Sequence, residues 1–197
     1  MDIISISWGM NEDVPEVTKA IDNAYSEGII ILASASNEGA NDCISFPARL
    51  KNVFCIGAAD GKGYDAGFNP PFLGSEKYSA LGAAVLGADV DTSGLLDGHS
   101  TTSRRMGTST ATPIAAGIAA VFLEYTRQFV DLPQGPENTT RMRKLFLGMS
   151  KSTVQLPYRY LVPWSLFGPS FDERKAREVI KEILRRSPGI QYFVGFV

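Results

Sequence analysis

The stretch IIILASASNEG, residues 29–39, joins an almost wholly apolar run to a polar turn. A strand that is apolar on both faces is typical of a parallel sheet with helices covering each side. We therefore predict a buried strand over residues 29–35. The polar residues after it would then lie at the carboxyl edge of the sheet, where open α/β sheets bind their ligands.

The segments on either side of this strand indicate a repeating strand–helix–strand unit. DIISIS (2–7) is a short β-rich run that ends at WGM, and NVFCIGAAD (52–60) is a further strand. The intervening residues 11–28 have the apolar periodicity of a helix. Parallel strands need such crossovers, which are right-handed. The sequence therefore predicts an α/β fold, a parallel sheet sandwiched by helices.

End signals support the helices along the chain. In residues 11–28, Asp13 can cap the helix, Pro15 suits its first turn and Gly28 can end it in a left-handed conformation. Further helices are predicted at 111–129, 136–151 and 170–186, the last capped by Ser170 or Asp172. The remaining segments are expected to be loops at 61–83 and 91–106, a short strand at 83–90 and irregular chain at 154–168.

Composition narrows the class of protein. The 197 residues suffice for one domain, and 44% hydrophobic and 20% charged residues are ordinary for a globular chain. A net charge of −2 favours neither a nucleic-acid partner nor an anionic membrane. No apolar run reaches the length of a membrane span and no secretory signal is visible, so the compartment stays open, with the cytoplasm slightly favoured. Cys43 and Cys55 are expected to be buried thiols rather than a disulfide.

GTSTATPIAAGIAA, residues 107–120, sets hydroxyl-bearing residues directly ahead of a run of small apolar residues. Pro113 fits the first turn of the helix predicted over 111–129, and Ser109 and its neighbouring threonines can cap that helix. The other interpretation is a nucleophile. A serine at a helix N-terminus lies beside unpaired N–H groups and a partial positive charge, which stabilise an oxyanion. The spacing alone favours capping.

Two other polar segments follow predicted strands. Asn37 follows the strand 29–35, and its amide could donate to a developing negative charge. Ser7, Trp8 and Gly9 follow the strand 2–7, and an extended backbone there could pair with an extended peptide. Taken singly, each segment is also an ordinary turn at the end of a strand.

Taken together and in this order, these segments resemble the subtilisin family of serine peptidases. GTSTATP (107–113) is similar to the family's Gly-Thr-Ser-x-Ala-Ser/Thr-Pro nucleophile motif. IIILASASNEGAND resembles the strand that leads to the oxyanion asparagine, and SFPARLKNVFCIGAAD (45–60) resembles the segment and strand that follow it. DIISISWG resembles the strand beside the substrate cleft. The resemblance covers roughly residues 2–130.

The resemblance implies roles for particular residues. Ser109 would be the nucleophile, and Asn37 would form the oxyanion hole together with the Ser109 N–H. Ser7, Trp8 and Gly9 would border the backbone of an extended polypeptide substrate. The wall of the primary specificity pocket would include Ala33, Ser34 and Ala35. Ser36 replaces the family's usual glycine before the oxyanion asparagine and Ser34 replaces a small apolar residue, and both could narrow or polarise that pocket. The resemblance implies no organic cofactor, and no residues are assigned to a metal.

The family's catalytic Asp and His precede the strand matched here by residues 2–7, so the resemblance implies that both lie upstream. The chain's single histidine, His99, is outside the family's His-Gly-Thr context, and Asp89, Asp91 and Asp97 match no triad position. We therefore expect residues 1–168 to be the C-terminal part of a subtilisin-like peptidase domain, inactive alone, with 169–197 a helical extension. The alternative is a non-catalytic peptide-binding or scaffold module on the same fold.

Overall fold

The computed structural model describes residues 1–41, 43–71, 77–89, 101–129, 137–151, 158–167 and 172–185. Within these residues a central sheet has the strand order β1-β2-β3-β4-β8-β7. Its strands are β1 Ile3–Ile6, β2 Ile30–Ser34, β3 Phe54–Ala59, β4 Tyr78–Leu81, β8 Arg159–Leu161 and β7 Ser150–Lys151. Neighbours from β1 to β8 pair in parallel, and only β7 runs antiparallel. The predicted α/β class and the three strands first recognised are confirmed.

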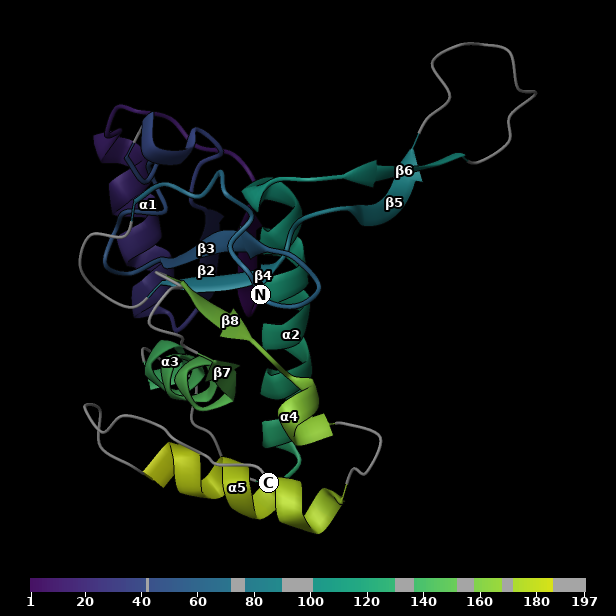
Figure 1. Ribbon diagram of the computed structural model, residues 1–197. Coiled ribbons are helices and arrows are strands. Elements are labelled where there is room, and N and C mark those ends of the chain that lie inside the picture. Colours follow the sequence, from purple (N-terminus) through teal and green to yellow (C-terminus); the bar gives the residue numbers. More distant parts are fainter. Residues whose placement is uncertain are drawn as a thin grey trace.

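Helices cover both faces of the sheet (Figure 1). On one face, Ile31 and Ala33 of β2 pack with Ile21 of helix α1, Pro15–Ser26. On the other, Ile30 and Leu32 pack with helix α2, Thr108–Arg127, and helix α3, Glu137–Met149. Alternate side chains of β2 therefore enter opposite halves of the core, which explains why every residue of this strand is apolar or small and buried.

The ends of α1 differ in part from the prediction. Pro15 stands at the start of the helix and Gly28 has the predicted positive φ, 78°. The cap was predicted wrongly: Val14 is the N-cap residue and no side chain caps the helix. Asp13 instead binds Arg49, whose Nη2 lies 2.6 Å from the Asp13 carboxylate. A partner distant in sequence has taken the carboxylate that the local pattern assigned to the cap.

Helix α2 lies close against the sheet because its inward face carries very small side chains. Ala111, Ala115 and Ala119, one turn apart, are all fully buried. The helix begins at Thr108, three residues before the predicted start. Pro113 consequently lies inside the helix rather than in its first turn, and Ser109 belongs to the first turn itself.

Several short elements occur where loops or irregular chain were predicted. Strand β4 lies within 61–83, strand β6, Thr101–Arg105, within 91–106, and β8 together with helix α4, Trp164–Phe167, within 154–168. Strand β5, Val85–Asp89, confirms the predicted strand but joins β6 in an antiparallel ribbon separate from the main sheet. Figure 1 shows this ribbon projecting from the body. Each missed strand is short and defined by its pairing partner, which local sequence does not reveal.

Helix α5, Glu173–Arg185, confirms the predicted amphipathic helix and packs on α3. Ala176, Ile180 and Ile183 form its buried stripe, and the Asp172 carboxylate caps it by accepting the Lys175 N–H at 3.1 Å. Among the described helices, none has the length and apolar character needed to cross a membrane.

The two cysteines differ in exposure. Cys55 is buried, whereas Cys43 is exposed, contrary to the expectation that both are buried, and neither forms a disulfide. Burial raises the pKa of Cys55 to about 12, so its thiol stays protonated at pH near 8. We expect iodoacetamide at that pH to alkylate Cys43 of the native protein and to spare Cys55. Intact-mass measurement checks this, and rapid addition of two equivalents would contradict it.

Candidate active site

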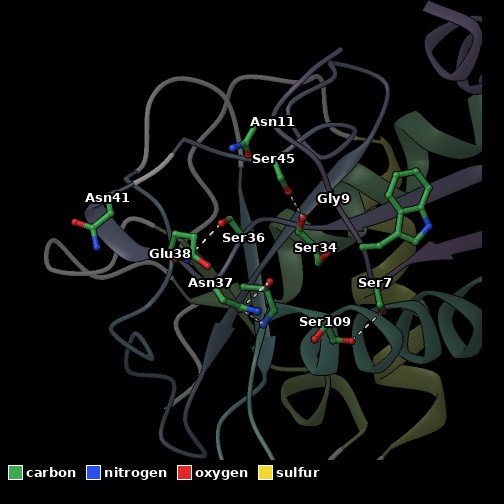
Figure 2. Close-up of a pocket in the computed structure, with 12 residues that line it drawn as sticks. Ser7, Gly9, Asn11, Ser34, Ser36, Asn37, Glu38, Asn41, Ser45 and Ser109 are labelled. Carbon is green, nitrogen blue, oxygen red and sulfur yellow. Dashed lines mark hydrogen bonds between the residues drawn. The ribbon is translucent and has the colours of Figure 1, made fainter. Parts of the chain in front are cut away.

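The carboxyl ends of β1 and β2 and the amino end of α2 meet around one open pocket of about 710 Å³ (Figure 2). The residues that line it come from these ends and from the segment after β2: Ser7, Trp8, Gly9, Asn11, Ser34, Ser36, Asn37, Glu38, Asn41, Ser45, Thr108 and Ser109. Most of the residues singled out from the sequence thus lie together. Ala33 and Ala35 do not line the pocket; both are fully buried in the core behind it.

Ser109 lies in the first turn of α2, where backbone N–H groups lack helical partners. The N–H groups of Thr110 and Ala111 donate to the Gly107 carbonyl, and that of Thr108 donates to the Asn37 side chain. Within the described part of the chain, this leaves the Ser109 N–H as the amide of that turn without an acceptor. It is available to an anion beside the Ser109 hydroxyl, where the helix dipole also favours negative charge.

Asn37 is oriented by Thr108. Its Oδ1 accepts the Thr108 N–H at 2.8 Å and the Thr108 hydroxyl at 3.1 Å. Because a backbone N–H requires an acceptor, these contacts fix which end of the amide is oxygen. The Nδ2 donor therefore stays free of Thr108, and it lies on the same side of Gly107 as the Ser109 hydroxyl. From the sequence, Thr108 was predicted only to cap the helix. Its position between Gly107 and Ser109 in the motif was the one sign that it could act on the site.

Gly107 lets the two groups approach. Its φ is 142°, a region that disfavours side chains. A Cβ at this position would lie 3.1 Å from Ser109 Oγ and 3.3 Å from Asn37 Nδ2. The missing side chain therefore leaves open the space that the serine hydroxyl and the asparagine amide share.

Ser7 is bonded to the backbone of the candidate nucleophile. Its hydroxyl donates to the Ser109 carbonyl at 2.9 Å (Figure 2). In a regular helix that carbonyl would accept the N–H of residue 113, but Pro113 has none. The end of β1 thus supplies the hydrogen bond that the proline removes, and it fixes the first turn of α2 against the sheet.

This contact predicts a measurable effect. Ser7→Ala is expected to destabilise the protein by no more than about 1 kcal/mol, since the bond is solvent-exposed. Thermal unfolding checks this value, with Ser7→Thr as the matched control because threonine keeps the hydroxyl. A Ser7→Thr variant as unstable as Ser7→Ala would contradict the assignment of this bond.

The segment Ser7–Gly9, which follows β1, is exposed and lines the pocket. Behind it, Met10 and Phe46 exchange two backbone hydrogen bonds of 2.9 Å each. Gly9 lies so close to this support that a Cβ would be 2.3 Å from Ser45 Oγ. Trp8 is half exposed. The chain is thus held on one side and open on the other, as pairing with an extended peptide requires.

The ionisable groups weighed from the sequence lie elsewhere. Of the residues that line the pocket, Glu38 alone is ionisable. Asp89 belongs to the β5–β6 ribbon, where it binds Arg105 at 2.7 Å. Asp91, Asp97 and His99 lie outside the described residues. Over the described ranges, no three His, Cys, Asp or Glu side chains converge as a metal site would require.

The fold and the pocket define a protein of the subtilisin-like class. The protease domain of PatA superposes with a TM-score of 0.65 and 26% identity, over 91% of this chain and 60% of that one. The prenylagaramide maturation protease PagA has the same fold, with a TM-score of 0.67, 24% identity and coverage of 91% and 62%.

Sequence comparison gives the family. The subtilase family model matches residues 1–141, and the chain belongs to that family. M-protease of Shouchella clausii is 32% identical over 61% of this chain and 29% of its own length. Subtilisin DY of Bacillus licheniformis is 31% identical over 62% of this chain and 43% of its own length. The chain therefore spans less than half the length of these relatives.

Proposed function

We propose that this chain carries the nucleophile, the oxyanion hole and one wall of the substrate cleft of a subtilisin-type serine endopeptidase. The general base would come from a polypeptide segment outside these residues. The observation that carries the proposal is the junction of Ser109 with Asn37, whose amide Thr108 orients toward the serine.

Each proposed residue has a defined step. Ser109 Oγ attacks the carbonyl carbon of the scissile peptide bond while the base takes its proton. The carbonyl oxygen becomes an anion that accepts hydrogen bonds from the Ser109 N–H and from Asn37 Nδ2. Collapse of this intermediate expels the amine, which receives the proton, and leaves an acyl-Ser109 ester. Water then hydrolyses the ester by the reverse sequence of proton transfers.

The open edge of β1 offers a place where the polypeptide segment that carries the base could bind. Strand β1 has β2 as its one neighbour in the described sheet, so its other edge is unpaired. Ile3, Ile4 and Ile6 on this strand are half-buried, and Val121 of α2 is 59% exposed. Proteins seldom leave an apolar edge strand uncovered. A parallel strand added here would end beside Ser7, next to the Ser109 backbone, where a base is needed.

The second candidate is a non-catalytic peptide-binding or scaffold module on the same fold. The exposed backbone edge at Ser7–Gly9 favours it, since binding there needs no base. The two functions differ in whether Ser109 reacts when a base is present. An in-frame upstream segment encoding an Asp-containing strand and a His-Gly-Thr motif would also favour the enzyme.

The test supplies the base chemically. The folded chain is treated with a fluorophosphonate probe at rising concentrations of imidazole, which can replace an absent histidine as proton acceptor. We expect labelling that increases with imidazole and disappears in Ser109→Ala. The His99→Ala variant should be labelled as strongly as the parent chain. If this variant were not labelled, His99 would be the base. A folded chain that imidazole never renders reactive would favour the scaffold.

A further inference from the structure

The pocket beside Ser109 is lined mainly by serine and asparagine residues. Trp8 is the one large apolar residue among those that line it. Two of the serines in the lining, Ser34 and Ser45, are only 5% and 8% exposed as residues. Figure 2 shows Ser34, Ser36 and Ser45 gathered at the same side of the pocket. An apolar side chain would have to desolvate these groups without replacing their hydrogen bonds to water.

Ser34, Ser45 and Glu38 give one part of this wall hydrogen-bond acceptors, while the donors Asn37 Nδ2 and the Ser109 N–H lie at the part beside the serine. The Ser45 hydroxyl donates to the Ser34 and Ala35 carbonyls, at 3.1 and 2.9 Å. Its oxygen can therefore only accept a further hydrogen bond. Ser34 is only 5% exposed as a residue, and its Oγ makes no hydrogen bond to any described residue and is not among the buried unpaired atoms, so it is open to a ligand in the pocket. Glu38 adds the one ionisable group of the lining, an acid. A ligand group that donates several hydrogen bonds and carries positive charge fits this environment.

We propose that this pocket selects a lysine or arginine side chain on the amino side of the scissile bond. The inference rests on the proposed peptidase function and names its substrate class. An ammonium or guanidinium group donates to the serine oxygens and is attracted by the Glu38 carboxylate. A neutral apolar side chain of equal length displaces water from the Ser34 hydroxyl without replacing its hydrogen bond, and an acidic one is repelled by the Glu38 carboxylate. The volume of about 710 Å³ admits either long cation.

Peptide binding to the intact chain tests the selection without catalysis. Acetyl-Ala-Ala-Ala-X-amide peptides are titrated with X as lysine, norleucine or glutamate, because norleucine matches the aliphatic part of lysine without its charge. Trp8 at the pocket reports binding by fluorescence, and Trp164→Phe removes the other tryptophan. We expect lysine to bind about tenfold more tightly than norleucine, the effect of one charge-assisted hydrogen bond, and glutamate most weakly.

Variants locate the origin of the preference. Glu38→Gln and Ser34→Ala should each reduce the lysine-to-norleucine ratio. Glu27→Gln is the matched control, because it removes an equal charge at the far end of α1 and should leave the ratio unchanged. Equal binding of lysine and norleucine, absence of binding, or a ratio insensitive to both pocket variants would overturn the inference.

The binding experiment can fail independently of the proposed peptidase function. Labelling of Ser109 without lysine selectivity would overturn the specificity alone. Lysine-selective binding by a chain whose Ser109 never reacts would overturn the peptidase and leave a selective peptide-binding module.

Discussion

Gly107→Ala is expected to reduce imidazole-supported labelling of Ser109 by about 10²-fold or more, the cost of losing one oxyanion-hole donor. The added Cβ would lie 3.1 Å from Ser109 Oγ and 3.3 Å from Asn37 Nδ2, inside the space proposed for the oxyanion. Asn37 cannot retreat without breaking its two hydrogen bonds to Thr108. The Gly107 backbone is held as well, since its N–H donates to the Gly82 carbonyl at 2.8 Å.

The same change strains the backbone. A φ of 142° is costly for alanine, by about 1–3 kcal/mol, so the melting temperature should fall as well. Gly117→Ala is the control because a Cβ there meets nothing within 4 Å. Because position 117 lies inside a helix, Gly117→Ala should raise the free energy of unfolding by about 0.5–1 kcal/mol. Its Ser109 should be labelled at the parental rate. Labelling of folded Gly107→Ala at the parental rate would contradict the proposed position of the oxyanion.

Asn37→Asp is expected to lower the labelling rate by at least about 10²–10³-fold, with little loss of stability. This magnitude is the one known for the oxyanion asparagine of subtilisin itself, a relative of this chain. Aspartate keeps an oxygen for the Thr108 N–H and hydroxyl, so the local hydrogen bonds survive. It replaces the Nδ2 donor with an anionic oxygen that repels the developing charge.

Two further variants separate donation from folding. Asn37→Ala loses the same donor and also leaves the Thr108 N–H unpaired, so it should be destabilised by about 1–3 kcal/mol. Asn41→Ala is the control, since Asn41 lines the same pocket on the side away from Ser109 (Figure 2). The rate of fluorophosphonate labelling and the melting temperature are measured for each. Normal labelling of Asn37→Asp would remove Asn37 from the oxyanion hole.

The parts of the fold predictable from sequence were those with strong local patterns. The apolar run of β2, Gly28 after α1 and the stripe of α5 each follow from a short window of sequence. Strands β4 and β8 do not, because each is defined by its neighbours in the sheet: β4 pairs with β3 and β8, and Arg159 of β8 pairs with Tyr78 of β4, far back along the chain. Asp13 was assigned to a cap for the same reason: its partner Arg49 lies 36 residues away.

The site shows the same division. Ser109 and Asn37 could be proposed from motifs, and the fold brings them to one pocket. The contact that orients Asn37 through Thr108 spans 71 residues, and the bond from Ser7 to the Ser109 carbonyl spans 102. Such contacts depend on the sheet register and on the start of α2, three residues earlier than its sequence pattern indicates. Pro113, which makes the Ser7 bond necessary, could be read from the sequence. Its position inside the helix could not.

The most direct test of the proposed nucleophile is to identify the residue that the fluorophosphonate modifies. The folded chain is labelled in imidazole, digested and sequenced by tandem mass spectrometry. We predict one phosphonylated residue, Ser109, and none in the chain unfolded before labelling. Modification of another serine, or none in a chain that remains folded, would contradict the assignment of Ser109 as nucleophile.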